Sequence, residues 1–191
     1  RVMVNNGLIC NDGLYEMDFP LLEEQAADPD AKIMILCSPH NPVGRVWTKE
    51  ELARVGEICK KNNVLVIADE IHSDLVYAGY VHTPFALASD APHLVCTSLG
   101  KTFNVAGLRL ANIFSSSAEL KKQYDQEIDA YSYSASNTFG LEMVQAAYSP
   151  EGEAWLEELL VYLQGNVEVV SEWCQKHNVG FTAPQGTFLC W

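Results

Sequence analysis

The sequence has little positive charge. Its 191 residues include 12 Lys and Arg against 25 Asp and Glu, which gives a formal net charge of −13 at pH 7. Nucleic acids and anionic membrane surfaces attract basic proteins, so this balance argues against both as partners. The apolar runs are also too short to span a bilayer, and no signal-peptide pattern opens the chain. We therefore expect no nucleic-acid partner and no membrane partner.

Patterns of paired cysteines and of metal-binding histidines are missing as well. The six cysteines include no C-x-x-C pair, and the five histidines include no H-E-x-x-H spacing. Cys37, Cys59 and Cys96 fall within apolar patterns, as buried thiols do. We therefore expect reduced cysteines, a cytoplasmic protein and no metal site.

The scarcity of cations makes one lysine conspicuous. Between Lys61 and Lys121 the only cationic side chains are Lys101 and Arg109. Burial disfavours the ammonium form of a lysine, so an amine in apolar surroundings can form a Schiff base or carry protons at neutral pH. The alternative is a structural lysine whose ammonium group reaches solvent from the end of a strand.

Apolar periodicity predicts an alternation of strands and helices. Short apolar runs at 33–37, 64–68 and 93–97 indicate buried parallel strands, and a further strand is predicted at 108–114. Thr48 and Glu51 form a capping box, and the helix that it opens has its apolar face at Leu52, Val55, Ile58 and Cys59. Further helices are predicted at 118–131 and 138–147, and a long amphipathic helix is predicted to start at Ser149. This alternation is typical of an α/β fold.

Three polar segments follow the predicted parallel strands. They are SPHNPVGRVW at 38–47, ADEIHSDL at 68–75 and SLGKTFNVAGL at 98–108. Ligands of open α/β sheets bind at the carboxyl ends of parallel strands. Each segment taken alone is a weak signal, but the three in this order and spacing are strongly specific.

In these segments the chain resembles fold-type I enzymes that depend on pyridoxal 5'-phosphate (PLP), the aspartate aminotransferase superfamily (aminotransferase class I/II). Within it, the chain is most similar to the cystathionine β-lyases of the MalY/PatB type, which are C-S lyases. The match runs in order from residues 15–19 to residues 184–191. The resemblance implies a three-layer α/β/α large domain with a mostly parallel sheet, a PLP cofactor, a small amino-acid substrate and a homodimer.

The resemblance also implies roles for three residues that handle the cofactor ring. Lys101 matches the lysine that forms a Schiff base with PLP and later removes the Cα proton of the substrate. Asp69 matches the carboxylate that keeps the pyridine nitrogen protonated, and Asn41 matches the donor to the phenolic oxygen. Taken alone, an aspartate in the position of Asp69 is more often a turn or helix-cap residue, and Asn41-Pro42 could belong to an ordinary turn.

Three further residues complete the implied site. His72 stands where aminotransferases of this superfamily usually carry a tyrosine, whereas the lyase branch has histidine there. Ser98 and Arg109 match phosphate ligands, because a hydroxyl and a guanidinium suit a dianionic phosphate. The chain departs from many relatives at Gly100, where they carry a serine before the lysine. One phosphate contact is therefore expected to be lost or supplied differently.

The implied function is a PLP-dependent C-S β-lyase that converts cystathionine or related cysteine S-conjugates to a thiol, pyruvate and ammonia. An aminotransferase is the alternative, since Lys101 serves both reactions. A regulatory protein that retains the PLP fold is a third reading. The presence of Lys101, Asp69, Asn41 and Arg109 together argues against a purely regulatory role.

The expected organisation is a PLP-binding large domain at 1–165, incomplete at its N-terminus, followed by the beginning of a small α+β domain at 166–191. The small domain is expected to start with strands at 181–183 and 187–189. Because the chain begins at Arg1 without an initiator methionine and stops at Trp191 within an apparent strand, we expect it to be a fragment.

Overall fold

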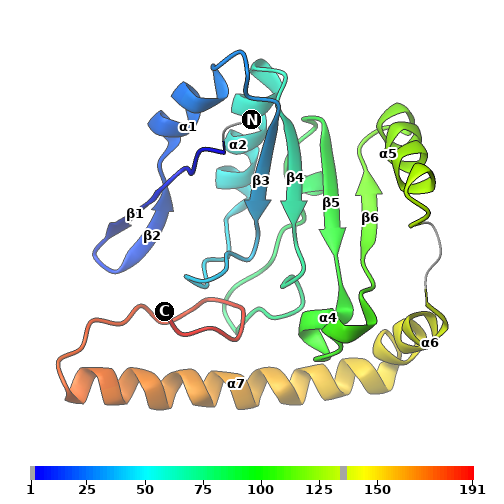
Figure 1. Cartoon of the computed structure of the whole chain (residues 1–191). Coiled ribbons are helices and arrows are strands. Elements are labelled where there is room, and N and C mark those ends of the chain that lie inside the picture. The colour runs from blue at the N-terminus through cyan, green and yellow to red at the C-terminus, as the bar shows by residue number, and fades with distance from the viewer. Residues whose placement is uncertain (1–2, 134–136) are drawn as a thin grey trace.

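The computed structural model describes residues 3–133 and 137–191 (Figure 1). The strands are β1 (Leu8–Asn11), β2 (Leu14–Met17), β3 (Ile33–Cys37), β4 (Leu65–Asp69), β5 (His93–Thr97) and β6 (Asn112–Ser115). The helices are α1 (Phe19–Ala26), α2 (Lys49–Lys61), α3 (Phe85–Ala88), α4 (Leu99–Thr102), α5 (Ala118–Ala130), α6 (Thr138–Ala147) and α7 (Pro150–Lys176), and η1 (Ala106–Leu108) is a 3-10 helix. The predicted α/β class is confirmed.

The main sheet has the strand order β3-β4-β5-β6, and β1 and β2 form a separate antiparallel hairpin. β3, β4 and β5 are parallel, while β6 runs antiparallel to β5, so the sheet is mostly parallel as predicted. The three strands predicted at 33–37, 64–68 and 93–97 are confirmed to within one residue. Cys37 pairs with Asp69 and Asp69 pairs with Cys96, so the carboxyl ends of the parallel strands reach the same edge of the sheet.

The core lies between this sheet and α2. The Thr48 side chain accepts a hydrogen bond from the Glu51 N–H, and the Glu51 carboxylate accepts one from the Thr48 N–H, which confirms the capping box. The predicted apolar face of the helix is buried in one cluster with sheet residues, namely Leu52, Val55, Ile58 and Cys59 with Leu36, Val66, Ala68 and Val95. The packing of α2 therefore fixes β3, β4 and β5 in the register that brings their carboxyl ends together.

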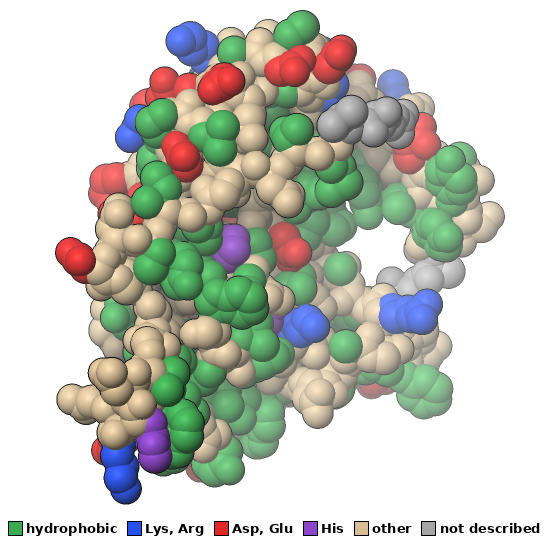
Figure 2. Space-filling view, turned by 60° about the vertical axis from the view of Figure 1, so that its left-hand side comes forward, with side chains coloured by type: hydrophobic (Ala, Val, Ile, Leu, Met, Phe, Trp, Pro, Cys, Tyr) green, Lys and Arg blue, Asp and Glu red, His purple; other side chains and the backbone are tan. Residues whose placement is uncertain are grey.

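The opposite face of β3 is open. Side chains alternate along a strand, so Leu36 faces α2 whereas Ile33 and Ile35 face the other way. Ile33 is 57% exposed and Ile35 is 65% exposed. In Figure 2, hydrophobic side chains occupy the middle of the face in view, and many acidic side chains lie along its upper rim. Parallel sheets are usually covered on both faces, so this open apolar face is unusual.

β6 is shorter than the strand predicted at 108–114. Residues Ala106–Leu108 form η1, and Arg109 adopts a left-handed conformation with φ of 50°. A left-handed residue interrupts extended backbone, so the strand starts only at Asn112. The helices predicted at 118–131 and 138–147 are confirmed as α5 and α6.

α7 is a single helix of 27 residues that begins after the N-cap Ser149. In Figure 1 it runs across the molecule beyond the carboxyl ends of β3, β4 and β5. The helix is continuous at residue 165, where the sequence analysis places a domain boundary. The division into domains at 1–165 and 166–191 stays a prediction. Nowhere in the described part of the chain is a helix both long enough and apolar enough to cross a membrane.

The prediction of strands at 181–183 and 187–189 is wrong, because residues 181–191, all of them described, contain no strand. The backbone here bonds to distant loops instead. The Gly186 N–H donates to the Gly44 carbonyl at 3.2 Å, and the Thr187 N–H donates to the Leu75 carbonyl at 2.7 Å. Thr187 also has φ of 69°, which is incompatible with a continuous strand.

Candidate active site

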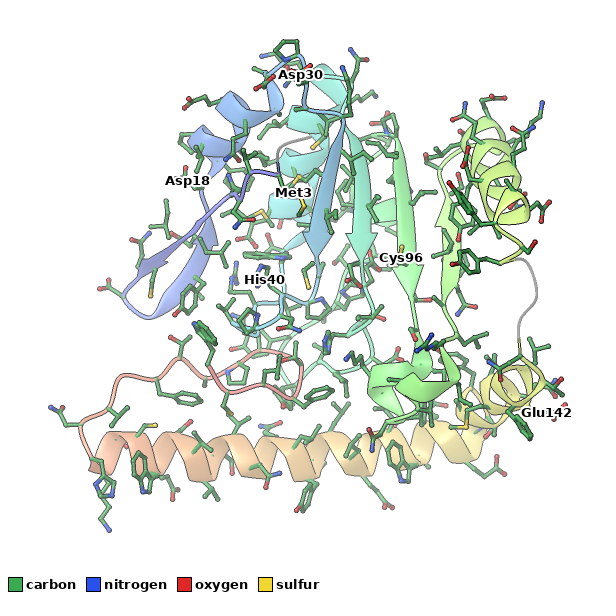
Figure 3. The ribbon with its side chains drawn as sticks, in the orientation of Figure 1. Met3, Asp18, Asp30, His40, Cys96 and Glu142 are labelled. Carbon is green, nitrogen blue, oxygen red and sulfur yellow. The ribbon has the colours of Figure 1, made fainter. Side chains whose placement is uncertain are left out.

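The site is built on the carboxyl ends of β3, β4 and β5. The register places Asp69 on β4 between Cys37 on β3 and Cys96 on β5, with all three side chains on the same face of the sheet. Figure 3 labels Cys96 on β5 and His40 just beyond β3. Burial raises the pKa of both thiols. The hydrogen bond from the Asn41 N–H opposes this rise at Cys37, and the negative charge of Asp69 adds to it at both, so the two cysteines stay neutral beside the carboxylate.

The turn after β3 carries Asn41. The side chain of Asn41 is exposed, and its backbone N–H donates to the Cys37 sulfur at 3.4 Å. Gly44 has φ of 71°, and a Cβ at this position would lie 2.3 Å from the Cβ of Pro184. Only glycine therefore allows the turn to contact the segment that follows α7.

His72 lies in the loop after β4 and is only 1% exposed. Neither of its ring nitrogens has a hydrogen-bond partner in the structure. Burial holds the pKa of His72 below its usual value, the positive charge of Lys101 lowers it further, and the negative charge of Asp69 opposes both. The ring of Phe188 packs edge-on against the imidazole, with centroids 5.4 Å apart. His72 is thus a buried imidazole whose two nitrogens lack partners in the structure and whose pKa is affected by the charges of both Lys101 and Asp69.

Lys101 lies on α4 beside a cavity of about 250 Å³. Ser98, Lys101 and Arg109 line this cavity together with Ile71 and the backbone around Gly100. The left-handed turn at Arg109 is what carries the chain from η1 back to the sheet next to the cavity. The structure thus gathers three of the residues proposed from sequence around one space.

Ser98 is already engaged within the protein. Its hydroxyl donates to the Leu110 carbonyl at 2.7 Å and accepts from the Gly100 N–H at 3.0 Å. Because a hydroxyl has only one proton, Ser98 can donate to an anion in the cavity only by releasing Leu110. The charge of Arg109 is therefore the more direct attraction for an anion there.

The proposed site residues thus fall into two groups. Lys101, Ser98 and Arg109 share the cavity, and the charges of Lys101 and Asp69 both act on His72. Asn41 stands apart at the end of the neighbouring strand, and among the described residues no hydrogen bond joins its side chain to the others. The cofactor contacts assigned to these six residues stay predictions.

Glu70 points away from this group, as the alternation of strand side chains predicts. It is 1% exposed, and its carboxylate accepts from the Phe85 N–H at 2.7 Å and lies 2.9 Å from the His82 Nε2. These contacts hold the start of α3 against the end of β4. Glu70 is therefore structural in this arrangement.

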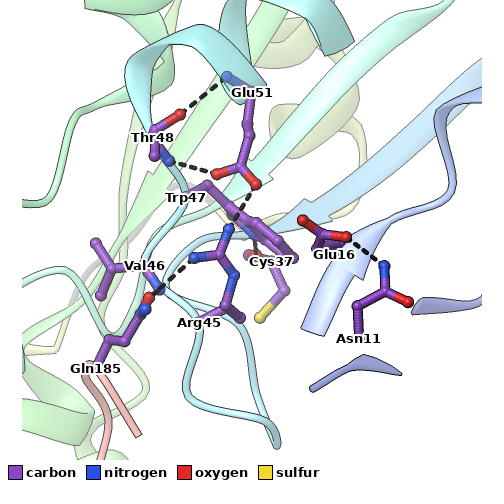
Figure 4. A network of polar contacts seen from close by, with 9 residues as sticks. All are labelled: Asn11, Glu16, Cys37, Arg45, Val46, Trp47, Thr48, Glu51 and Gln185. Carbon is purple, nitrogen blue, oxygen red and sulfur yellow. Dashed lines mark hydrogen bonds and ion pairs between the residues drawn. The ribbon is translucent and has the colours of Figure 1, made fainter. Parts of the chain in front are cut away.

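A polar network fixes the turn after β3 to the segment after α7 (Figure 4). Arg45 is 6% exposed, and its guanidinium donates to the Glu51 carboxylate at 2.5 Å and to the Gln185 side-chain oxygen at 3.2 Å. The same Gln185 oxygen accepts from the Val46 N–H at 2.9 Å. Sequence reasoning missed this network, because Arg45 and Gln185 are 140 residues apart.

A second missed contact lies beside the lysine. The Thr102 hydroxyl donates to the Asp74 carboxylate at 2.9 Å. Both residues lie inside quoted motifs, yet nothing in their spacing indicates that they meet. The six cysteines are free thiols, and within residues 3–133 and 137–191 no group of three or more His, Cys, Asp or Glu side chains could hold a metal ion.

Comparison with known proteins identifies the family. The model of the aminotransferase class I and II family matches residues 12–191. The cystathionine beta-lyase PatB of Bacillus subtilis is 36% identical over 196 residues, covering 100% of this chain and 50% of its own length. The protein MalY of Escherichia coli is 33% identical over 186 residues, covering 94% of this chain and 46% of its own length.

Solved structures agree with the sequence relatives. The PLP-bound C-S lyase from Staphylococcus hominis is 36% identical, with a TM-score of 0.88 over 96% of this chain and 47% of its own. Cystalysin from Treponema denticola, which contains PLP, is 32% identical, with a TM-score of 0.92 over 98% of this chain and 49% of its own. The chain thus spans about half the length of the relatives that it matches. With its order of motifs, its sheet and these relatives, the chain belongs to the aminotransferase class I and II family.

Proposed function

We propose that the chain carries the PLP site of a C-S β-lyase that acts on cystathionine or related cysteine S-conjugates. The observation that carries the proposal is the environment of His72. Its imidazole is buried, neither nitrogen has a partner in the structure, and the charges of Lys101 and Asp69 act on it. A buried polar group without a partner costs free energy, so this side chain is placed to meet a group that the chain itself lacks.

The residues present fit PLP as that group. The phenolic oxygen of the cofactor offers an acceptor to the one N–H of the neutral His72 ring, and to the side-chain amide of Asn41 on the neighbouring strand end. Arg109 offers a guanidinium to the phosphate at the cavity that Lys101 also lines. When bound, PLP supplies an electron-withdrawing ring that stabilises negative charge at the substrate Cα. Asp69 is placed to hold a proton on the pyridine nitrogen.

Lys101 has two tasks in this proposal. With PLP bound, its Nζ would hold the cofactor until the amino acid takes its place, and the freed amine would take the proton from the substrate Cα. Loss of that proton lets the substrate expel a thiolate from its β-carbon. With one water consumed, the products are a thiol, pyruvate and ammonia. His72, where related aminotransferases have tyrosine, and relatives named as cystathionine beta-lyase and C-S lyase support this outcome over transamination.

An aminotransferase is the second candidate, and a local similarity supports it. Kynurenine–oxoglutarate transaminase 3 of Mus musculus is 41% identical over 81 residues, which cover 41% of this chain and 18% of the mouse protein. In transamination no thiolate leaves, Lys101 would return the proton that it took, and PLP would keep the amino group of the substrate. The products are then a keto acid and pyridoxamine phosphate, so the two reactions are distinguishable by their products.

We further infer that the protein is a cytoplasmic homodimer with a small amino-acid substrate. Free thiols at all six cysteines support a reducing compartment. Exposed aromatic side chains along α7 support association, since Trp155 is 46%, Tyr162 69% and Trp173 55% exposed.

The test is to incubate the PLP-loaded protein with cystathionine and to measure pyruvate, ammonia and pyridoxamine phosphate. A lyase gives pyruvate and ammonia in equal amounts and little pyridoxamine phosphate. Lys101→Ala should abolish product formation, whereas the exposed Lys122→Ala should not. Pyridoxamine phosphate without pyruvate would contradict the lyase and favour the aminotransferase.

A further inference from the structure

Lys101 lies on a helix that depends on its surroundings. α4 has only four residues, and so short a helix has almost no stability of its own. The Ser98 side chain caps its first turn, and Leu99 and Thr102 are 1% and 2% exposed. The position of the lysine is therefore set by the contacts of the residues around it.

One of these contacts leads directly to the loop of His72. The hydroxyl of Thr102, the residue after Lys101, donates to Asp74 Oδ2 at 2.9 Å. Asp74 follows His72 by two residues in the loop after β4. A hydrogen bond to a carboxylate is stronger than one between neutral groups. The bond therefore ties the helix that carries Lys101 to the loop that carries His72.

A second contact holds Phe103, the C-cap residue that directly follows this helix. The ring of Phe103 stacks on Trp155 of α7, with centroids 5.4 Å apart, and meets Tyr148 edge-on at 6.5 Å. Asp74 also lies near Tyr148, whose pKa is raised by burial and further by the charge of Asp74. Asp74 thus stands where the loop after β4, α4 and the start of α7 converge.

We propose that Asp74 and Thr102 are positioning residues, whose mutual hydrogen bond fixes the helix of Lys101 to the loop of His72. The proposal rests on the proposed function, in which Lys101 is the reacting amine. Proton transfer and covalent bond formation need the reacting atoms within a narrow range of distances, so a small displacement of the helix slows both. Neither Asp74 nor Thr102 needs to touch the substrate for this effect.

Substitutions at Thr102 separate the hydrogen bond from the shape of the side chain. Thr102→Val keeps the shape and removes the hydroxyl, whereas Thr102→Ser keeps the hydroxyl. Asp74→Asn keeps an acceptor oxygen but removes its charge. Thr182→Val is the matched control, because the Thr182 hydroxyl donates to the Gly13 carbonyl at 2.5 Å, in another part of the molecule.

The first readout is the rate at which acetic anhydride labels Lys101 in the PLP-free chain, relative to the exposed Lys49. Release of α4 exposes the amine, so Thr102→Val should raise this ratio. The expected rise is about fivefold, because the net loss of one hydrogen bond shifts an equilibrium by about that factor. Asp74→Asn should give a smaller rise, and Thr102→Ser and Thr182→Val should stay within about twofold of the unchanged chain. The second readout is the rate at which Lys101 gains a pyridoxyl group when PLP is added and the chain is reduced with borohydride. Thr102→Val should slow this rate most and Asp74→Asn less.

A ratio for Thr102→Val equal to that for Thr182→Val would overturn the proposal. If Thr102→Val does not fold, Asp74→Asn decides, and a labelling ratio equal to the control would overturn it too. Failure of the proposed function looks different. The unchanged chain would then carry no pyridoxyl group at Lys101, while the labelling ratios in the PLP-free chain would still report on the hydrogen bond.

Discussion

At the scale of single residues, the charge of Asp69 is central to the proposed reaction. Asp69→Asn is nearly isosteric, so the chain should fold and still take up PLP. Without the negative charge the pyridine nitrogen loses its proton, and pyruvate release should fall by about 100-fold or more, as when other preorganised charges are removed. Circular dichroism and the absorbance of bound cofactor serve as controls. Near-normal turnover would exclude Asp69 as the partner of the pyridine nitrogen.

His72 should make stability depend on pH. Its pKa lies below the ordinary 6.5, so the unfolded chain takes up a proton near pH 6.5 while the folded chain does not. The contribution of the neutral His72 ring to the free energy of unfolding is therefore fully present above pH 6.5. This contribution is lost as the pH falls below 6.5. One such group changes the free energy of unfolding by at most about 1.4 kcal/mol per pH unit.

Urea unfolding between pH 7 and pH 5 measures this effect. The pH dependence should be weaker in His72→Asn than in the unchanged chain. Burial also lowers the pKa of His40, so some dependence should remain in His72→Asn. An identical slope in His72→Asn and the unchanged chain would show that His72 does not titrate as described.

At the scale of elements, the network of Arg45 joins the turn after β3 to the segment after α7. Arg45→Met removes the buried guanidinium that donates to both Glu51 and Gln185, so we expect a loss of about 2–4 kcal/mol in the free energy of unfolding. Arg54→Met is the matched control, since Arg54 pairs with Glu23 at 3.3 Å but both side chains are at least half exposed. The control should lose less than about 1 kcal/mol. Equal losses would mean that the Arg45 network does not dock the segment.

The elements differ in how far the sequence predicts them. Strands β3, β4 and β5 each carry an apolar run and agree with the prediction to within a residue, and the capping box predicts where α2 starts. The path of residues 181–191 is not predicted by the sequence. There the backbone N–H groups of Thr187 and Gly186 donate to the carbonyls of Leu75 and Gly44, and no local pattern indicates these contacts. The predicted start of β6 is wrong for another reason, because Arg109 adopts a left-handed conformation.

The site likewise has residues that local sequence patterns predict and contacts that depend on the fold. Its motifs name Asn41, Asp69, His72, Ser98, Lys101 and Arg109, because each is a chemically specific residue in a recognisable segment. The contact between Thr102 and Asp74 could not be predicted, since it depends on the path of the loop after β4. The engagement of Ser98 with Leu110 likewise follows from the turn at Arg109.

At the scale of the whole molecule, the open face of β3 should make the chain associate. Ile33 and Ile35 are exposed on a strand at one edge of the sheet, and exposed apolar strands favour pairing between chains. Sedimentation should show a mean mass that rises with concentration. Ile35→Lys should reduce that rise, whereas Val81→Lys, at a residue 80% exposed in a loop, should not. A monomer at all concentrations would contradict this expectation.

The central claim is that this chain holds PLP covalently through Lys101. The most direct measurement is to add PLP to the chain, reduce with borohydride and map the modified peptides by mass spectrometry. We predict one pyridoxyl group, on Lys101, that is absent in Lys101→Ala and unchanged in Lys122→Ala. A pyridoxyl group on another lysine, or spread over the exposed lysines without preference for Lys101, would contradict the account.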